Sequence, residues 1–178
     1  DTTRSTRPYL DYQHLSLHDY QLAIEDLISE KSILNMKLRH AQLKEQSGLK
    51  LIHLSGNYQM DSLGMSLQDL DLTTDVSSMR GDAAMPWSLF QSDPTAPLTL
   101  QLKTTLGTKD LLLLGGDQLS QRAEGRALYH RLARNRLLSP LKLQLDLSGT
   151  LQELQLRQAE LSWPELLTFK TQGSLREL

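Results

Sequence analysis

The fold is decided by residues 140–156, which read PLKLQLDLSGTLQELQL. Leucine occupies every second position at the start of this stretch: Leu141, Leu143, Leu145 and Leu147. The same spacing occurs in residues 98–103, where polar residues separate Leu98, Leu100 and Leu102. Successive side chains of a β-strand point to opposite faces, so both stretches predict strands with one apolar and one polar face.

Extended segments of this kind are predicted throughout residues 9–108, after a polar linker over residues 1–8. Polar or glycine-centred breaks are expected at three places: Ser47-Gly48, Ser55-Gly56-Asn57 and Asp61–Gly64. A shift in the apolar phase between Leu67 and Leu70 predicts a β-bulge. The pattern weakens over residues 82–97, where three prolines argue against an interior strand.

Residues 109–139 differ in kind and predict a helical insertion. Leu111–Leu114 is continuously apolar, and the following residues are rich in Arg, Ala and Leu with Leu128 and Leu132 at helical spacing. Strands resume over residues 140–178. There the phrase LSGTLQEL (147–154) is echoed by TQGSLREL (171–178), which suggests a repeat architecture. The predicted fold is mainly β, with repetitive antiparallel strands.

The composition narrows the class of protein. The chain has 178 residues, enough for one domain or slightly more, and its 19 basic and 21 acidic residues leave a net charge of −2. This balance argues against a nucleic-acid partner, which needs many phosphate contacts. There is no cysteine and no apolar run of about 20 residues that could cross a membrane. The chain begins without methionine and ends within a patterned stretch, so we expect it to be part of a longer protein.

Catalytic and metal-binding patterns are not found, so we expect no enzyme activity, no cofactor and no metal site. The five histidines are scattered and do not form a ligand motif; a surface pair is the simpler interpretation of His14 and His18. Asp69 and Asp71 alternate with leucines, which is typical of the polar face of a strand.

One basic stretch lies in the predicted helix. Arg126, His130 and Arg134 share a face at i, i+4, i+8 spacing, and such a face can lie on anionic lipid. The alternative is a solvated helix whose leucines plug the end of the sheet.

Several stretches resemble the TamB proteins of the AsmA-like family of Gram-negative bacteria. They are LKEQSGLKLIHLSGNYQMDSLGMSLQDLDLTT (43–74), MPWSLF (85–90), LGTKDLLLLGGD (106–117) and residues 140–178. The resemblance implies a curved sheet, like a groove or taco, whose concave aliphatic face carries phospholipid acyl chains between the inner and outer membranes. It also implies a periplasmic segment of a parent anchored in the inner membrane, next to adjacent segments of that parent, with a role in outer-membrane assembly through a β-barrel partner.

On this hypothesis the working residues form a surface, with these lipid-groove candidates: Leu98, Leu100, Leu102, Leu141, Leu143, Leu145 and Leu147. Burying each methylene group of an acyl chain contributes roughly 0.8 kcal/mol, so lipid would be held without a headgroup site. Two alternatives stay open. The leucines can pack as a closed core against the helix or a second sheet, or the sheet can be a scaffold that pairs with partners through its edges without lipid.

Overall fold

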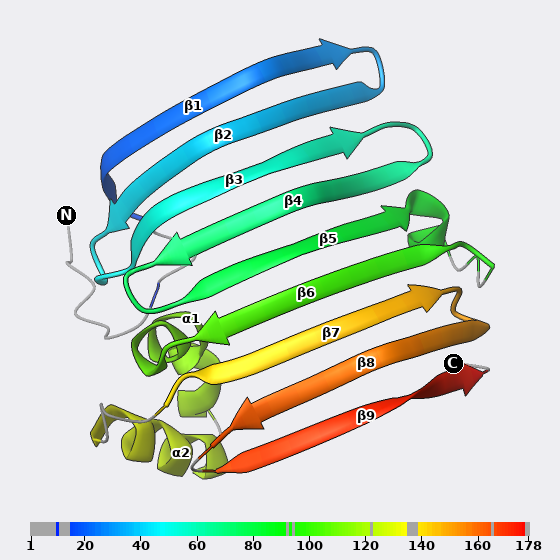
Figure 1. Ribbon diagram of the computed structural model, residues 1–178. Coiled ribbons are helices and arrows are strands. Elements are labelled where there is room, and N and C mark those ends of the chain that lie inside the picture. The colour runs from blue at the N-terminus through cyan, green and yellow to red at the C-terminus, as the bar shows by residue number, and fades with distance from the viewer. Residues whose placement is uncertain are drawn as a thin grey trace.

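A computed structural model describes residues 10, 15–91, 93, 95–121, 123–134, 139–164 and 166–176. Nine strands form one open antiparallel sheet whose order, β1 to β9, follows the sequence (Figure 1). The mainly β fold is therefore confirmed. The predicted linker, residues 1–8, and His14 lie outside the described residues.

Hairpins and one helical insertion connect the strands. The strands are β1 (Leu17–Glu30), β2 (Ile33–Glu45), β3 (Lys50–Met60), β4 (Gly64–Thr74), β5 (Ser78–Pro86), β6 (Leu98–Leu106), β7 (Leu141–Gly149), β8 (Glu153–Trp163) and β9 (Leu167–Arg176). A 3-10 helix, η1 (Trp87–Gln91), follows β5, and the helices α1 (Thr108–Gln121) and α2 (Ala123–Arg134) lie between β6 and β7.

Strand register places apolar side chains in rows that run across the sheet on one face. The longest row crosses all nine strands: Leu22, Ala41, Leu54, Leu72, Met79, Thr104, Leu143, Leu161 and Phe169. A second row crosses β2 to β9: Met36, Tyr58, Leu67, Ala83, Leu100, Leu147, Leu156 and Gly173. A third crosses β4 to β9: Leu70, Gly81, Leu102, Leu145, Ala159 and Thr171.

The opposite face is polar. One of its rows runs Ser55, Asp71, Arg80, Lys103, Gln144, Glu160 and Lys170, from β3 to β9. The alternation seen in the sequence therefore separates the two faces across the whole sheet, as the side-chain period of a strand requires.

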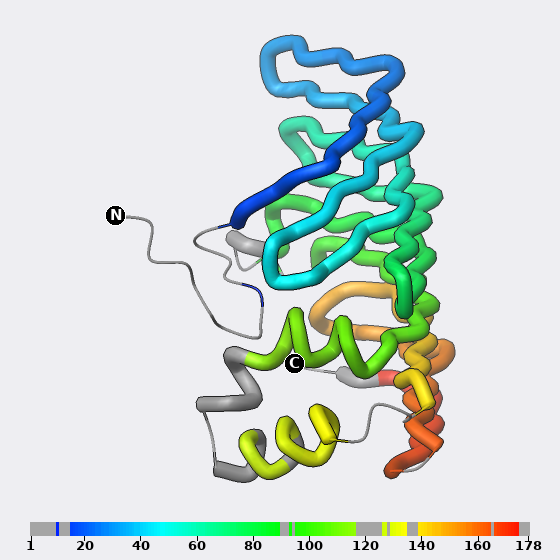
Figure 2. Tube along the Cα trace, turned by 90° about the vertical axis from the view of Figure 1, so that its left-hand side faces the viewer, coloured from blue at the N-terminus to red at the C-terminus, as the bar shows by residue number. Residues whose placement is uncertain are grey.

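The apolar face is the concave one. Figure 2 shows the sheet bending toward the side on which α1 and α2 lie. Thr74 at the end of β4 pairs with Leu51 on the apolar face, and its hydroxyl donates a hydrogen bond to Asp110 of α1. We call the residues of the three apolar rows the concave apolar face.

Irregularities near the middle of the strands produce the bend. Register shifts fall between Leu38 and Ala41 in β2 and between Leu67 and Leu70 in β4. Asp69, inside the second shift, has φ of 53°, and β-bulges of this kind bend a strand and increase its twist. The bulge predicted from the leucine phase is confirmed.

Two predictions, made from a glycine and from prolines, were wrong. Gly56, expected in a break, lies inside β3 beside the bulge of β4; an added Cβ would lie 3.5 Å from the Cα of Leu70. A glycine within a strand is typical of such a place. Residues 82–86, where the prolines argued against an interior strand, belong to the interior strand β5, and Pro86 is tolerated because it is the last residue of that strand.

The repeated phrases occupy different places in the sheet. Gly149 ends β7 with φ of 131°, whereas Gly173 lies within β9 opposite Leu156. The turn predicted over Asp61–Gly64 is present, because the Asp61 carboxylate accepts backbone hydrogen bonds from Leu63 and Gly64. The helical insertion is confirmed and begins at Thr108, one residue before the predicted boundary.

Gly81 lies where the backbones of β5 and β6 approach each other closely. A Cβ at this position would lie 2.1 Å from the backbone oxygen of Gln101 on β6. We expect Gly81→Ala to lower the free energy of unfolding by about 1–3 kcal/mol through overpacking, measured by urea denaturation. The matched control is Gly173→Ala, because a Cβ there has no atom within 4 Å. Equal stability of the two variants would contradict the close approach.

Candidate functional site

The concave apolar face is the candidate site because it is extensive and most of its side chains are half-buried or exposed. Few apolar side chains of the described residues are buried: Leu10, Ala41, Ala96, Leu113 and Leu132. Ala41 is the one among them that belongs to the concave apolar face. At the two edges of this face, Leu22 is 63% exposed and Phe169 is 51% exposed. Exposed apolar surface on this scale indicates a binding surface.

The lipid-groove candidates all lie on this concave side, in the central strands β6 and β7. Leu100 pairs with Leu147, Leu102 with Leu145, and Leu98 with Gly149. Leu141 and Leu143 continue the same face toward α1, opposite Leu106 and Thr104. Every one of these leucines is half-buried. The sequence pattern therefore identified a set of side chains that the fold does bring together.

The seven leucines are half-buried, whereas Thr104, which lies in the longest row opposite Leu143, is 8% exposed. In the described part of the chain α1 and α2 pack mainly against each other, and no second sheet is present. Leu132 of α2 is fully buried and Leu113 of α1 is 7% exposed. The backbone N–H of Leu10 donates to the carbonyl of Leu113 at 2.8 Å. The fully buried side chains thus lie on the helices, and the leucines of β6 and β7 are half-buried.

Ionic interactions are confined to other surfaces. On the convex face, Glu25 pairs with Lys37 at 3.0 Å and with Arg39 at 2.7 Å, and Asp71 pairs with Arg80 at 3.0 Å. Hydrogen bonds from Arg39, and then from Lys37, lower the pKa of Glu25 to about 2. The rows of the concave apolar face contain no charged residue. A bound molecule would therefore meet mainly apolar side chains and no charge along these rows.

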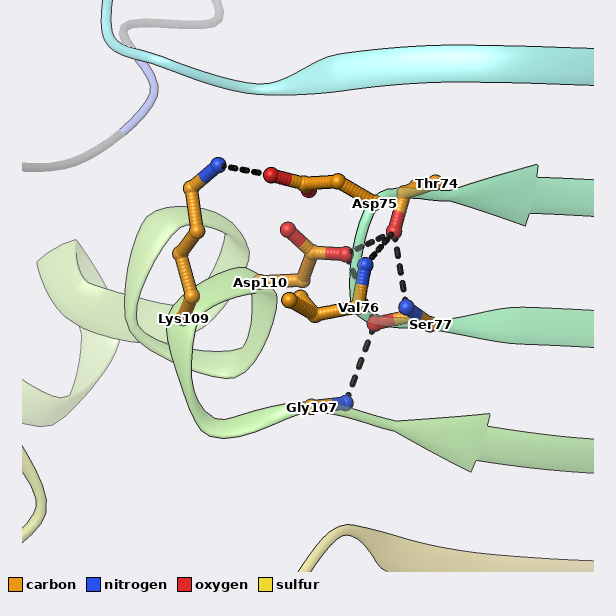
Figure 3. Close-up of polar contacts among 7 residues, drawn as sticks. All are labelled: Thr74, Asp75, Val76, Ser77, Gly107, Lys109 and Asp110. Atoms are coloured by element: carbon orange, nitrogen blue, oxygen red, sulfur yellow. Dashed lines mark hydrogen bonds and ion pairs between the residues drawn. The ribbon is translucent and has the colours of Figure 1, made fainter. Parts of the chain in front are cut away.

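A buried carboxylate attaches α1 to the sheet at one rim of this face (Figure 3). Asp110, in the first turn of α1, is fully buried and accepts hydrogen bonds from the hydroxyls of Thr74 and Ser77, the latter at 2.6 Å. The Ser77 hydroxyl in turn accepts the N–H of Gly107 at 3.0 Å. An acidic residue in the first turn is also favoured by the helix dipole.

Two further features support this attachment. Lys109 forms an exposed ion pair with Asp75 at 2.7 Å (Figure 3). A Cβ at Gly107 would lie 2.6 Å from the backbone oxygen of Val76, so only glycine lets the chain pass from β6 into α1 so close to the β4–β5 turn. The start of the helical insertion is therefore fixed against the sheet.

The basic residues predicted to face a membrane are placed on α2. Arg126, His130 and Arg134 are all exposed, while Leu132 on the same helix is fully buried. The rings of Tyr129 and His130 meet edge-to-face at 5.8 Å. The helix therefore presents these basic side chains to solvent, and it lies on the side of the sheet where the concave apolar face lies (Figure 2).

The two aspartates predicted on the polar face of a strand are both engaged by neighbouring side chains. Asp69 lies in the β4 bulge, where its carboxylate accepts a hydrogen bond from Asn57 at 2.9 Å; Asp71 is engaged by Arg80. Among described residues, no three or more His, Cys, Asp or Glu side chains gather as a metal site. None of the described helices is long and apolar enough to cross a membrane.

The sequence pattern did not predict the contact between His40 of β2 and His53 of β3, because this contact depends on strand register.

Removal of the Asp110 carboxylate should weaken the attachment of α1 to the sheet and lower the stability of the protein. Asp110→Ala leaves the hydroxyls of Thr74 and Ser77 without their acceptor, so we expect it to cost about 1–3 kcal/mol in the free energy of unfolding. Lys109→Ala removes an exposed ion pair and should cost about 1 kcal/mol or less. Urea denaturation followed by tryptophan fluorescence measures both. An Asp110→Ala variant as stable as Lys109→Ala would show that this attachment is unimportant.

The ion pairs of Glu25 should give the convex face a defined pH dependence. Since the pKa of Glu25 falls from 4.5 to about 2 in the folded protein, its contribution to stability is complete above pH 4.5 and is lost as the pH falls toward 2. We expect Glu25→Gln to destabilise the protein at pH 7 and to have a smaller effect at pH 3, measured by urea denaturation. An equal effect at both pH values would contradict this assignment.

Comparison of the chain with protein-family models, with curated proteins and with solved structures finds no match. What the chain does must therefore be inferred from its own residues, above all from the open concave apolar face.

Proposed function

We propose that the concave apolar face binds phospholipid acyl chains and lets them move along the sheet. One observation carries this proposal: an apolar row crosses all nine strands on the concave side, and most of its side chains are half-buried or exposed. A sheet with one apolar face must bury that face against another apolar surface. An acyl chain is a suitable partner because it offers hydrocarbon with no polar group to satisfy.

The dimensions of the face suit a lipid chain. Nine strands at about 4.8 Å spacing give a face roughly 40 Å long across the strands. The hydrocarbon core of a bilayer is about 30 Å thick and contains two opposed acyl chains, so one chain needs about half that length. A complete acyl chain therefore fits along the rows while its headgroup stays in water at a rim.

Movement along the face follows from its uniformity. Each strand offers the chain uncharged side chains, and transfer of each methylene group from water contributes roughly 0.8 kcal/mol wherever it binds. A displacement by one strand exchanges one set of uncharged contacts for another. Such a surface favours transport over storage at one fixed position.

The resemblance to TamB proteins suggests where in the cell, and next to which partners, this lipid binding would take place. The chain would be a non-enzymatic, periplasmic segment of a parent that is anchored in the inner membrane. Adjacent segments of the parent would continue the lipid path toward the outer membrane, and a β-barrel partner would link it to outer-membrane assembly. The exposed cations of α2 would then face lipid headgroups near one rim.

Two charges placed on the face should abolish lipid binding. Leu143→Asp with Leu145→Asp puts carboxylates into two neighbouring rows on β7, where a hydrocarbon chain would have to desolvate them. We expect phospholipid to co-purify with the wild-type chain and to be lost from this variant, measured by native mass spectrometry and lipid extraction. Circular dichroism checks that the variant is folded.

The matched control places the same two charges on the convex side. Ser78→Asp with Thr99→Asp changes two exposed residues of the neighbouring strands β5 and β6 and should leave lipid binding intact. A folded Leu143→Asp/Leu145→Asp variant that keeps its lipid would refute the proposal, and so would a wild-type chain that retains none.

A scaffold without lipid is the second candidate, and the edges of the sheet favour it. The β1 edge is interrupted by register shifts and by the positive φ values of Asp19 and Asp26, which hinder pairing with another strand. No residue described in β9 has a positive φ, and this edge can accept an added strand. Self-association at low micromolar concentration without bound lipid would favour this candidate.

A further inference from the structure

Three methionines form a row on the concave side of the sheet, at the end where the β3–β4 hairpin lies. Met60 of β3 pairs with Met65 of β4, and Met65 pairs with Met85 of β5. Each is two residues from a member of the second apolar row with no register shift between them, so all three side chains are on the concave side. The hydroxyl of Tyr58, a member of that row, donates a hydrogen bond to the Met60 Sδ at 3.4 Å. We call Met60, Met65 and Met85 the methionine row.

All the sulfur atoms of the chain belong to this side of the sheet. The sequence contains five methionines and no cysteine. Met36 lies in the second apolar row and Met79 in the longest one, so they share the concave side with the methionine row. All five side chains are half-buried. A small oxidant can therefore reach the thioethers, and it meets no thiol that would react first.

We infer that the methionine row is a modification site, at which a hydroperoxide such as hydrogen peroxide converts apolar side chains of the concave side into polar ones. The sulfur lone pair attacks one peroxide oxygen, and the O–O bond breaks. The sulfur is oxidised by two electrons, the attacked oxygen stays on it as a sulfoxide, and the other oxygen leaves as water. The flexible apolar thioether thereby becomes a polar, chiral group.

Three sulfoxides in one row would change what the concave side can bind. The Tyr58 hydroxyl can donate to the oxygen formed on Met60, because it already contacts that sulfur. An acyl chain over the row would have to desolvate the oxygens on Met65 and Met85 without giving them a hydrogen bond, which is unfavourable. This consequence rests on the proposed lipid binding. Oxidation of the row and its loss of apolar character do not depend on it.

The experiment treats the folded wild-type chain with increasing concentrations of hydrogen peroxide. Peptide mass spectrometry locates each added oxygen, the dye 8-anilinonaphthalene-1-sulfonate reports accessible apolar surface, and native mass spectrometry measures retained phospholipid. We expect one oxygen on each methionine of the row, weaker dye fluorescence and a loss of phospholipid of about tenfold or more. Two methionine sulfoxide reductases, one for each sulfoxide epimer, should restore both signals in the presence of dithiothreitol.

Two matched variants separate the methionine row from the other methionines. Met60→Leu/Met65→Leu/Met85→Leu keeps the row apolar and of similar volume but removes its sulfur atoms, so its dye and lipid binding should survive peroxide. Met36→Leu/Met79→Leu keeps the methionine row and should remain as sensitive to peroxide as the wild-type chain. Circular dichroism establishes that each sample is folded before and after treatment.

The inference is overturned if the methionine row of the folded chain gains no oxygen, or if complete oxidation leaves dye fluorescence unchanged. It is also overturned if the variant with three leucines loses dye binding as much as the wild-type chain does. A wild-type chain that holds no phospholipid before peroxide is added refutes the proposed function instead. The added oxygens and the dye then still decide whether the methionine row is a modification site.

Discussion

Agreement between side-chain alternation and strand register is the constraint on which this structure depends. The row across nine strands remains on one face only if every pairing keeps residues of the concave side opposite one another. A slip by one residue at any hairpin would turn all the apolar side chains of that strand to the convex face. The mid-strand bulges do not break this rule. Leu67 and Leu70 lie three positions apart, yet both face the concave side because the bulge inserts one extra residue between them.

The sheet is held together without a large buried core. Backbone hydrogen bonds join each strand to its neighbours, and half-buried leucines contact one another along the rows. The ion pairs of the convex face contribute little individually, because exposed pairs are screened by water and salt. The fully buried groups gather around α1 and α2, where Asp110 and Leu132 are located. The fully buried side chains thus attach the helices, while most side chains on the concave side of the sheet remain accessible to a ligand.

Much of the fold could be predicted from the sequence, because a period of two is a direct signal of a one-sided strand. The leucines of β6 and β7, the bulge near Leu70 and the helical insertion all followed from spacing. Composition misled where a glycine or proline had a local role, as at Gly56 and Pro86. The concave side was not predictable, since curvature depends on how bulges bend the strands. The His40–His53 contact depends on register between strands and left no signal in the spacing.

The order of the strands has a consequence for how the chain folds. Each strand pairs only with its neighbours in the sequence, so segments that are distant along the chain do not have to pair with each other. Contacts that are local along the chain favour fast folding, and here each new hairpin can add to an edge that is already formed. Growth of the sheet would then be a stepwise process, like the extension of a zipper, and damage at one end would leave the other end folded.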